Sequence, residues 1–205
     1  MSIRRSRIAL AATLLSLAVP SAAHADFVAH RVATASVGAK AHHPSKAHSA
    51  QECANQDLAP TPGNLPAIRA AILCLHNQVR SGHGLSRLSA DGKLRRVAAA
   101  HSADMVAHDY FDHTTPGGVT MVDRIVHSGY VRPDRGWMVG ENLEWGTGSL
   151  ATPRGAMKAW MNSPEHRANV LRRGYEELGV GISIGTPSPG NPSGATYTVD
   201  FGTIR

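Results

Sequence analysis

The alternating pattern near the C-terminal end constrains the fold of this sequence most strongly. Large apolar residues recur at every second position in two segments, 180–184 and 197–201, which is the period of β-strands. A loop rich in proline and glycine, residues 186–194, separates the two segments. This arrangement predicts an antiparallel hairpin with one buried face. Because most of the preceding segments show helical spacing, the sequence predicts an α+β fold in which helices cover a sheet.

The helical segments begin at recognisable capping residues. We expect helices over 66–80, from a Ser89 cap to about residue 105, and over 120–128. A fourth helix is expected to begin at Pro153 after the N-cap Thr152. His101 lies on the apolar stripe of the second helix. There a hydrogen-bonded, half-buried histidine is a better interpretation than a ligand.

The first 25 residues have the features of a secretory signal. Arg4, Arg5 and Arg7 precede an apolar run, 8–19, that is too short to span a bilayer. Ala23 to Ala25 form a small-x-small cleavage site. The Arg4–Arg5 pair leaves both general secretory and twin-arginine export open. No later segment has the length of a membrane helix, so we expect a secreted, extracellular or cell-wall-associated protein.

Composition divides the remaining chain into a linker and one domain. Residues 26–64 are rich in alanine, serine, proline and histidine, which is typical of a segment without a core. Residues 65–205, roughly 140, suffice for one domain, for which we expect a monomer. The formal charge is +6, and the signal holds three arginines and no acid, so the mature chain carries +3. This weak balance does not favour nucleic acid as a partner.

Cys53 and Cys74 are the only two cysteines. In an exported protein they most simply form one disulfide, which would attach the end of the linker to the first helix. A reactive thiol is the alternative. It has less support, since no cysteine lies near the histidines and glutamate considered below.

Three short stretches carry candidate functional groups. His113 lies in a turn-forming stretch, 110–118, that leaves its imidazole in a loop. In the expected strand 137–145, Gly140 permits close backbone approach, Glu141 points into a cleft and Asn142 orients its neighbours. Ser163 and Pro164 begin a new helix, and His166 falls in its first turn, where the helix dipole favours a neutral imidazole.

Five motifs together resemble the bacterial branch of the CAP superfamily (cysteine-rich secretory proteins, antigen 5 and pathogenesis-related 1 proteins), also called the SCP domain. The resemblance covers about residues 68–202. It implies a three-layer α–β–α sandwich with a mainly antiparallel central sheet. In sequence order the motifs are Leu75-His76-Asn77-Gln78-Val79-Arg80, Phe111-Asp112-His113, Gly140-Glu141-Asn142, Trp160 to Leu171, and Gly179-Val180-Gly181.

The resemblance also implies a central cleft that carries two histidines and two glutamates. His113, Glu141 and His166 match three of these groups. The fourth is an acid three residues after the tryptophan of the preceding helix, and Ser163 stands at that position here. This chain therefore has three of the four cleft groups.

Two imidazoles and a carboxylate could hold a divalent ion such as zinc, with His113, His166 and Glu141 as ligands. We therefore weigh two hypotheses. The first is a secreted binding or effector module whose cleft holds a metal or small ligand and whose partner is a cell-wall polymer, a lipid or another protein. The second is a metal-dependent extracellular hydrolase, similar to a peptidase, that uses the same cleft. The absence of a recognisable activated nucleophile motif favours the first.

Overall fold

The computed structural model describes residues 52–132, 134–188 and 193–205. The predicted signal peptide and residues 26–51 of the predicted linker lie outside these ranges. The elements follow in the order α1 (Leu65–Gly82), β1 (Ser89–Ala90), α2 (Gly92–Ala107), α3 (Met121–His127), β2 (Trp137–Gly146), a 3₁₀ turn (Gly148–Ala151), α4 (Pro153–Asn162), α5 (Pro164–Val170), β3 (Glu177–Ile184) and β4 (Ala195–Ile204).

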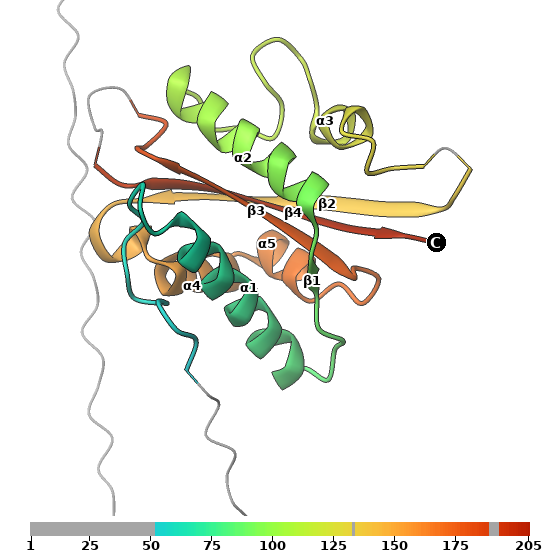
Figure 1. The fold of residues 1–205 in the computed structure, drawn as a ribbon, viewed down its shortest axis with the longest axis horizontal. Coiled ribbons are helices and arrows are strands. Elements are labelled where there is room, and N and C mark those ends of the chain that lie inside the picture. The colour runs from blue at the N-terminus through green and yellow to red at the C-terminus, as the bar shows by residue number, and fades with distance from the viewer. Residues whose placement is uncertain (1–51, 133, 189–192) are drawn as a thin grey trace, which may run out of the picture. The chain divides into compact units, whose positions relative to one another are not determined.

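The sheet forms the middle of three layers. Its strand order is β1-β3-β4-β2, with β1 parallel to β3 and both other pairs antiparallel. Helices α1, α4 and α5 lie on one face, and α2 and α3 lie on the other (Figure 1). This confirms the predicted α+β class and the mainly antiparallel sheet between two helical layers.

Strand β4 is buried on both faces, so the expectation of one buried face was wrong for it. Tyr197, Val199 and Phe201 pack in the larger core with α1 and α4. On the opposite face, the Thr198 hydroxyl accepts a hydrogen bond of 2.8 Å from Ser102 of α2. In β4 the alternation in the sequence thus distinguishes two buried faces. One face packs in the apolar core, and the other makes a polar contact with α2.

Helix α2 lies directly against β3, and two glycines make this possible. A Cβ atom at Gly179 would lie 2.2 Å from the backbone of Leu94, and one at Gly181 would lie 2.0 Å from the backbone of Ala98. Real Cβ atoms do not approach backbone so closely. The small residues that alternate with the apolar ones in β3 therefore mark the path of α2.

Most helix starts lie where the capping signals predict them, with one correction. Ser89 belongs to the short strand β1, and Asp91 caps α2 by accepting 2.8 Å hydrogen bonds from the backbone N–H groups of Lys93 and Leu94. Thr152 caps α4 as predicted, by accepting from the Gly155 N–H. Within the described part of the chain, no helix combines the length and apolar character that crossing a membrane requires.

The last residues of the predicted linker pack against the domain. Cys53 is buried and bonded to Cys74 of α1, as predicted. Beyond the disulfide, Gln56 is buried and its carbonyl accepts a 2.9 Å hydrogen bond from the Arg154 N–H. The packed part of the chain therefore begins before Leu65. The composition misses this because the disulfide helps to order a segment that has little apolar surface of its own.

Candidate functional site

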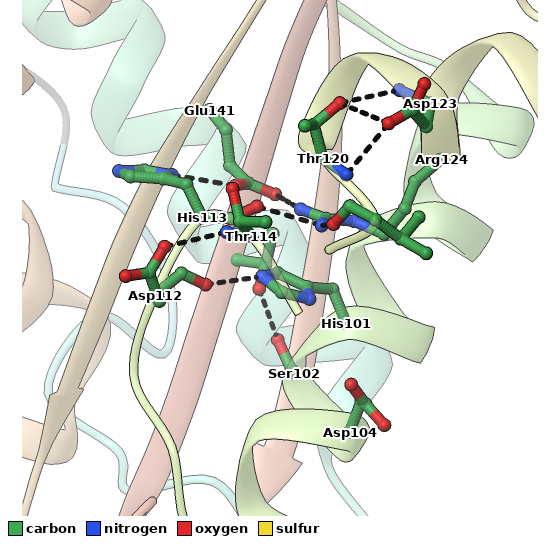
Figure 2. Close-up of polar contacts among 12 residues, drawn as sticks. His101, Ser102, Asp104, Asp112, His113, Thr114, Thr120, Asp123, Arg124 and Glu141 are labelled. Atoms are coloured by element: carbon green, nitrogen blue, oxygen red, sulfur yellow. Dashed lines mark hydrogen bonds and ion pairs between the residues drawn. The ribbon is translucent and has the colours of Figure 1, made fainter. Parts of the chain in front are cut away.

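Glu141 is at the centre of the candidate site, in the middle of edge strand β2. Its side chain is only 1% exposed, and both carboxylate oxygens are engaged. Nδ1 of His113 lies 2.8 Å from Oε1, and Nη2 of Arg124 donates to Oε2 at 2.7 Å. Figure 2 shows the carboxylate held between the imidazole and the guanidinium.

Arg124 connects α3 to both the carboxylate and the histidine loop. Besides bonding Glu141, it donates through Nη1 to the carbonyls of His113, at 2.9 Å, and Val119, at 3.3 Å. A reciprocal capping box between Thr120 and Asp123 fixes the start of α3 immediately before it. Sequence reasoning missed Arg124, because only the apolar residues of this helix carried a pattern.

His101 supports the loop that carries His113. It is fully buried on α2, and its Nε2 lies 3.0 Å from the carbonyl of Asp112, the residue before His113 (Figure 2). Burial lowers the pKa of His101, which favours a neutral imidazole that donates to this carbonyl. His101 is thus hydrogen-bonded, as expected, but it is fully buried and not half-buried, and it positions the loop.

The site favours an ionised Glu141. Burial alone would raise the pKa of this carboxyl, but the hydrogen bond from His113 and the charge of Arg124 outweigh it and lower the pKa. The same hydrogen bond raises the pKa of His113, whose side chain is half exposed. Asp200 lies directly opposite Glu141 on β4, and burial followed by the nearby Glu141 charge raises its pKa well above the usual range.

Asn142 joins β2 to α5. Its Nδ2 donates to the carbonyl of His166 at 3.0 Å, and its Oδ1 accepts from Asn169 at 2.9 Å. The same Asn169 amide also lies 3.2 Å from the carbonyl of Glu141. The amide of Asn142 therefore orients its neighbours, as the sequence predicts. Gly140 is needed beside it, because a Cβ there would lie 2.1 Å from the Tyr175 hydroxyl.

The other end of α5 is held by the buried Arg80 of α1. Its Nη1 donates to the carbonyls of Val170, at 2.9 Å, and Arg172, at 3.0 Å. Its Nη2 donates to the carbonyl of Tyr175 at 3.2 Å. A cation at a helix C-terminus also stabilises the helix, because it lies at the negative end of the helix dipole. Arg80 is thus the anchor that fixes α5, and with it His166, against the helical layer.

His166 lies in the first turn of α5, as predicted, and is partly buried. Burial is the main cause that lowers its pKa, and the charge of His113 lowers it further. Ser163, which stands where the family pattern has its second acid, makes no side-chain hydrogen bond to the start of this helix. Because this residue is a serine, that position supplies no carboxylate to the cleft.

A cleft of about 350 Å³ opens over the edge of β2, between α3 and α5. Its lining includes His113, Gly140, Glu141, Asn169, Arg172 and Tyr175. Neither His166 nor Asn142 is among the lining residues, and the Asn142 side chain is fully buried. The structure thus places His113 and Glu141 in one cleft, with His166 nearby.

The described arrangement does not fit a divalent metal. No group of three histidine, cysteine, aspartate or glutamate side chains within residues 52–132, 134–188 and 193–205 is arranged to hold a metal ion. Both oxygens of Glu141 already have partners, and one of these is a guanidinium cation 2.7 Å away. A cation bound to Glu141 would have to displace one of these two partners, and it would lie close to the charge of Arg124.

Taken together, the fold and the cleft define a three-layer α–β–α domain with a histidine–glutamate cleft. The family model described as "Cysteine-rich secretory protein family" (CAP) matches residues 73–201, and the chain belongs to this family. The resemblance noted from the five motifs is thereby confirmed.

Individual relatives agree with this assignment. Uncharacterized protein YkwD of Bacillus subtilis is 34% identical over 137 residues, which are 67% of this chain and 50% of that protein. Uncharacterized membrane protein YlbC of the same organism is 34% identical over 111 residues, 54% of this chain and 30% of that protein. The chain thus spans half or less of the length of these relatives.

Two solved structures share the fold. An extracellular protein containing an SCP domain from Bacillus anthracis is 30% identical, with a TM-score of 0.53 over 71% of this chain and 44% of that one. An outer surface protein of Borrelia burgdorferi has a TM-score of 0.54 over 71% of this chain and 96% of that one. At 20% identity, the second supports the fold alone.

Proposed function

We propose that this chain is an exported binding protein whose cleft recognises a ligand without catalysing a reaction on it. The observation that carries this proposal is the state of Glu141, whose two oxygens are bonded to His113 and Arg124. A general base must reach the proton that it abstracts and must have a pKa near the working pH. Glu141 has a lowered pKa and no unoccupied oxygen, so it is a poor base and serves to hold the cleft together.

Export is supported by the predicted signal at residues 1–25 and by a similar protein described as extracellular. The partner we propose is a cell-wall polymer or a lipid, bound by a monomer of this chain. Both partners are accessible to a protein outside the cell, and neither requires chemistry at the cleft.

The zinc expectation stays a prediction, and calorimetry tests it directly. Zinc is titrated into the mature chain and into the His113→Ala, His166→Ala double variant. One-to-one binding that disappears in the variant would establish His113 and His166 as zinc ligands. A metal-dependent hydrolase would then become the better proposal.

The binding proposal is tested by sedimentation with purified cell walls and, separately, with phospholipid vesicles. We expect the mature chain to pellet with one of the two without releasing soluble wall fragments or free fatty acid. The variant for comparison is Glu141→Gln. It should weaken pelleting, because it removes the carboxylate that holds His113 and Arg124 in the cleft. Absence of pelleting with either material would refute the binding proposal. Release of products by the wild type but not by Glu141→Gln would establish catalysis.

A further inference from the structure

Side chains already donate hydrogen bonds to the outward-facing backbone carbonyls of strand β2 at the cleft. The carbonyl of Val139 accepts from the Tyr175 hydroxyl at 3.2 Å, and that of Glu141 accepts from Asn169 at 3.2 Å. Just beyond the cleft, Leu143 accepts from the Trp160 indole at 2.9 Å. These carbonyls point away from β4, and in an antiparallel strand the N–H of the same residue points the same way.

Val139 and Glu141 therefore direct N–H donors to the cleft side of β2, while side chains occupy their carbonyls. This arrangement also protects the edge from pairing with another strand, since a strand needs acceptors as well as donors. What remains suits a ligand group that accepts hydrogen bonds and donates none.

The charges of the cleft point to the same kind of ligand. Arg172 lines the cleft, its side chain is exposed, and none of the ion pairs among the described residues includes it. Its guanidinium lies 5.9 Å from the centroid of the Tyr175 ring, which holds it over the cleft wall. The one acid of the lining, Glu141, is already paired with Arg124.

We propose that the cleft binds an anionic oxyacid group, a carboxylate or a phosphate, between the Arg172 guanidinium and the N–H groups of Val139 and Glu141. This inference rests on the proposed binding function and names the chemical class of its ligand. Arginine and backbone N–H groups are the usual partners of such anions, because both present donors without acceptors. Cell-wall peptides supply carboxylates, whereas phospholipids and phosphate-bearing polymers supply phosphates.

The test is an NMR titration of the ¹⁵N-labelled mature chain with three probes. These are inorganic phosphate, acetyl-dialanine with a free carboxylate, and the uncharged amide of the same dipeptide. We expect one or both anions to shift the Val139 and Glu141 amide signals and the amide to shift neither. Binding of the carboxylate alone would indicate a cell-wall peptide as the source of the group. Binding of phosphate alone would indicate a phospholipid or a phosphate-bearing polymer.

Two neighbouring arginines provide a matched pair of variants. Arg172→Ala should weaken binding of the anion by about tenfold or more, the value of one charge-assisted hydrogen bond. Arg173 is also exposed but does not line the cleft, so Arg173→Ala should change the affinity by less than about twofold. Both variants alter exposed side chains, so both should fold.

Three outcomes would overturn this inference. The first is that no anion shifts the β2 amides. The second is equal weakening by both arginine variants, which would indicate general attraction to a basic surface. The third is equal binding of the dipeptide and its uncharged amide. Pelleting with cell walls or vesicles in any of these cases would preserve the binding function and reject only the anionic ligand.

Discussion

Replacing Arg124 with methionine should destabilise the protein, because the buried carboxylate of Glu141 then loses its cationic partner. Methionine keeps much of the length of the side chain but removes the bond to Glu141 Oε2 and the bonds to the carbonyls of His113 and Val119. Removal of one partner of a buried ion pair costs about 3–5 kcal/mol. Because the Arg124 side chain is 11% exposed and His113 still bonds Glu141, we expect the lower end, about 3 kcal/mol.

A double-mutant cycle with Glu141→Gln separates the ion pair from the other contacts of Arg124. In the glutamine background Arg124→Met leaves no carboxylate unpaired, so it should cost only about 1 kcal/mol, for the lost carbonyl contacts. The coupling energy is then about 2 kcal/mol. Urea unfolding followed by tryptophan fluorescence measures all four proteins, since Trp160 is fully buried and reports loss of the core.

The pH dependence gives an independent check on the same reasoning. Without Arg124 the pKa of Glu141 rises, so the carboxyl of the variant takes up a proton on mild acidification. The difference in stability between wild type and Arg124→Met should therefore shrink as pH falls. A loss below about 0.5 kcal/mol at neutral pH, or a coupling energy near zero, would refute the role assigned to this pair.

Three further predictions concern other features of the chain. His113 has a raised pKa in the folded state. Its contribution to stability should be complete below about pH 6.5 and fall as pH rises through that raised pKa, so urea midpoints of wild type and His113→Gln should converge at high pH. The Cys53→Ser, Cys74→Ser variant should lose about 3 kcal/mol, because the disulfide closes a loop with a sequence separation of 21, and equal melting temperatures would contradict this. Gly181→Ala should cost about 3 kcal/mol or more in thermal unfolding, since its Cβ would meet the α2 backbone, whereas Gly82→Ala, with nothing within 4 Å, should be tolerated.

The sequence predicts those parts of the fold that local signals encode. Thr152 before Pro153 marks the start of α4, and the two-residue alternation marks β3 and β4. Strand β1 has only two residues, too few to show a period, so the local pattern favours a helix cap at Ser89. The burial of both faces of β4 depends on which helices cover the sheet, and no single strand contains that information.

The candidate site divides in the same way. His113, Glu141 and His166 are found from short motifs, because each motif combines the residue with its own local geometry. Arg124 has no such motif, and its role exists only because α3 folds back over β2. Asp200 belongs to the alternating pattern of β4, and only the strand register shows that it lies opposite Glu141.

These two missed residues determine the electrostatic character of the cleft. The family pattern of two glutamates and two histidines has the composition of a cation site, and the motifs of this chain supply three of these four groups. Here Ser163 replaces one acid, Arg124 neutralises the other, and the raised pKa of Asp200 favours its uncharged form. With Arg172 on the lining, the balance of charge is positive. The motifs locate the cleft, but Arg124 of α3 and Arg172, which follows α5, are the residues that favour the proposed anionic ligand.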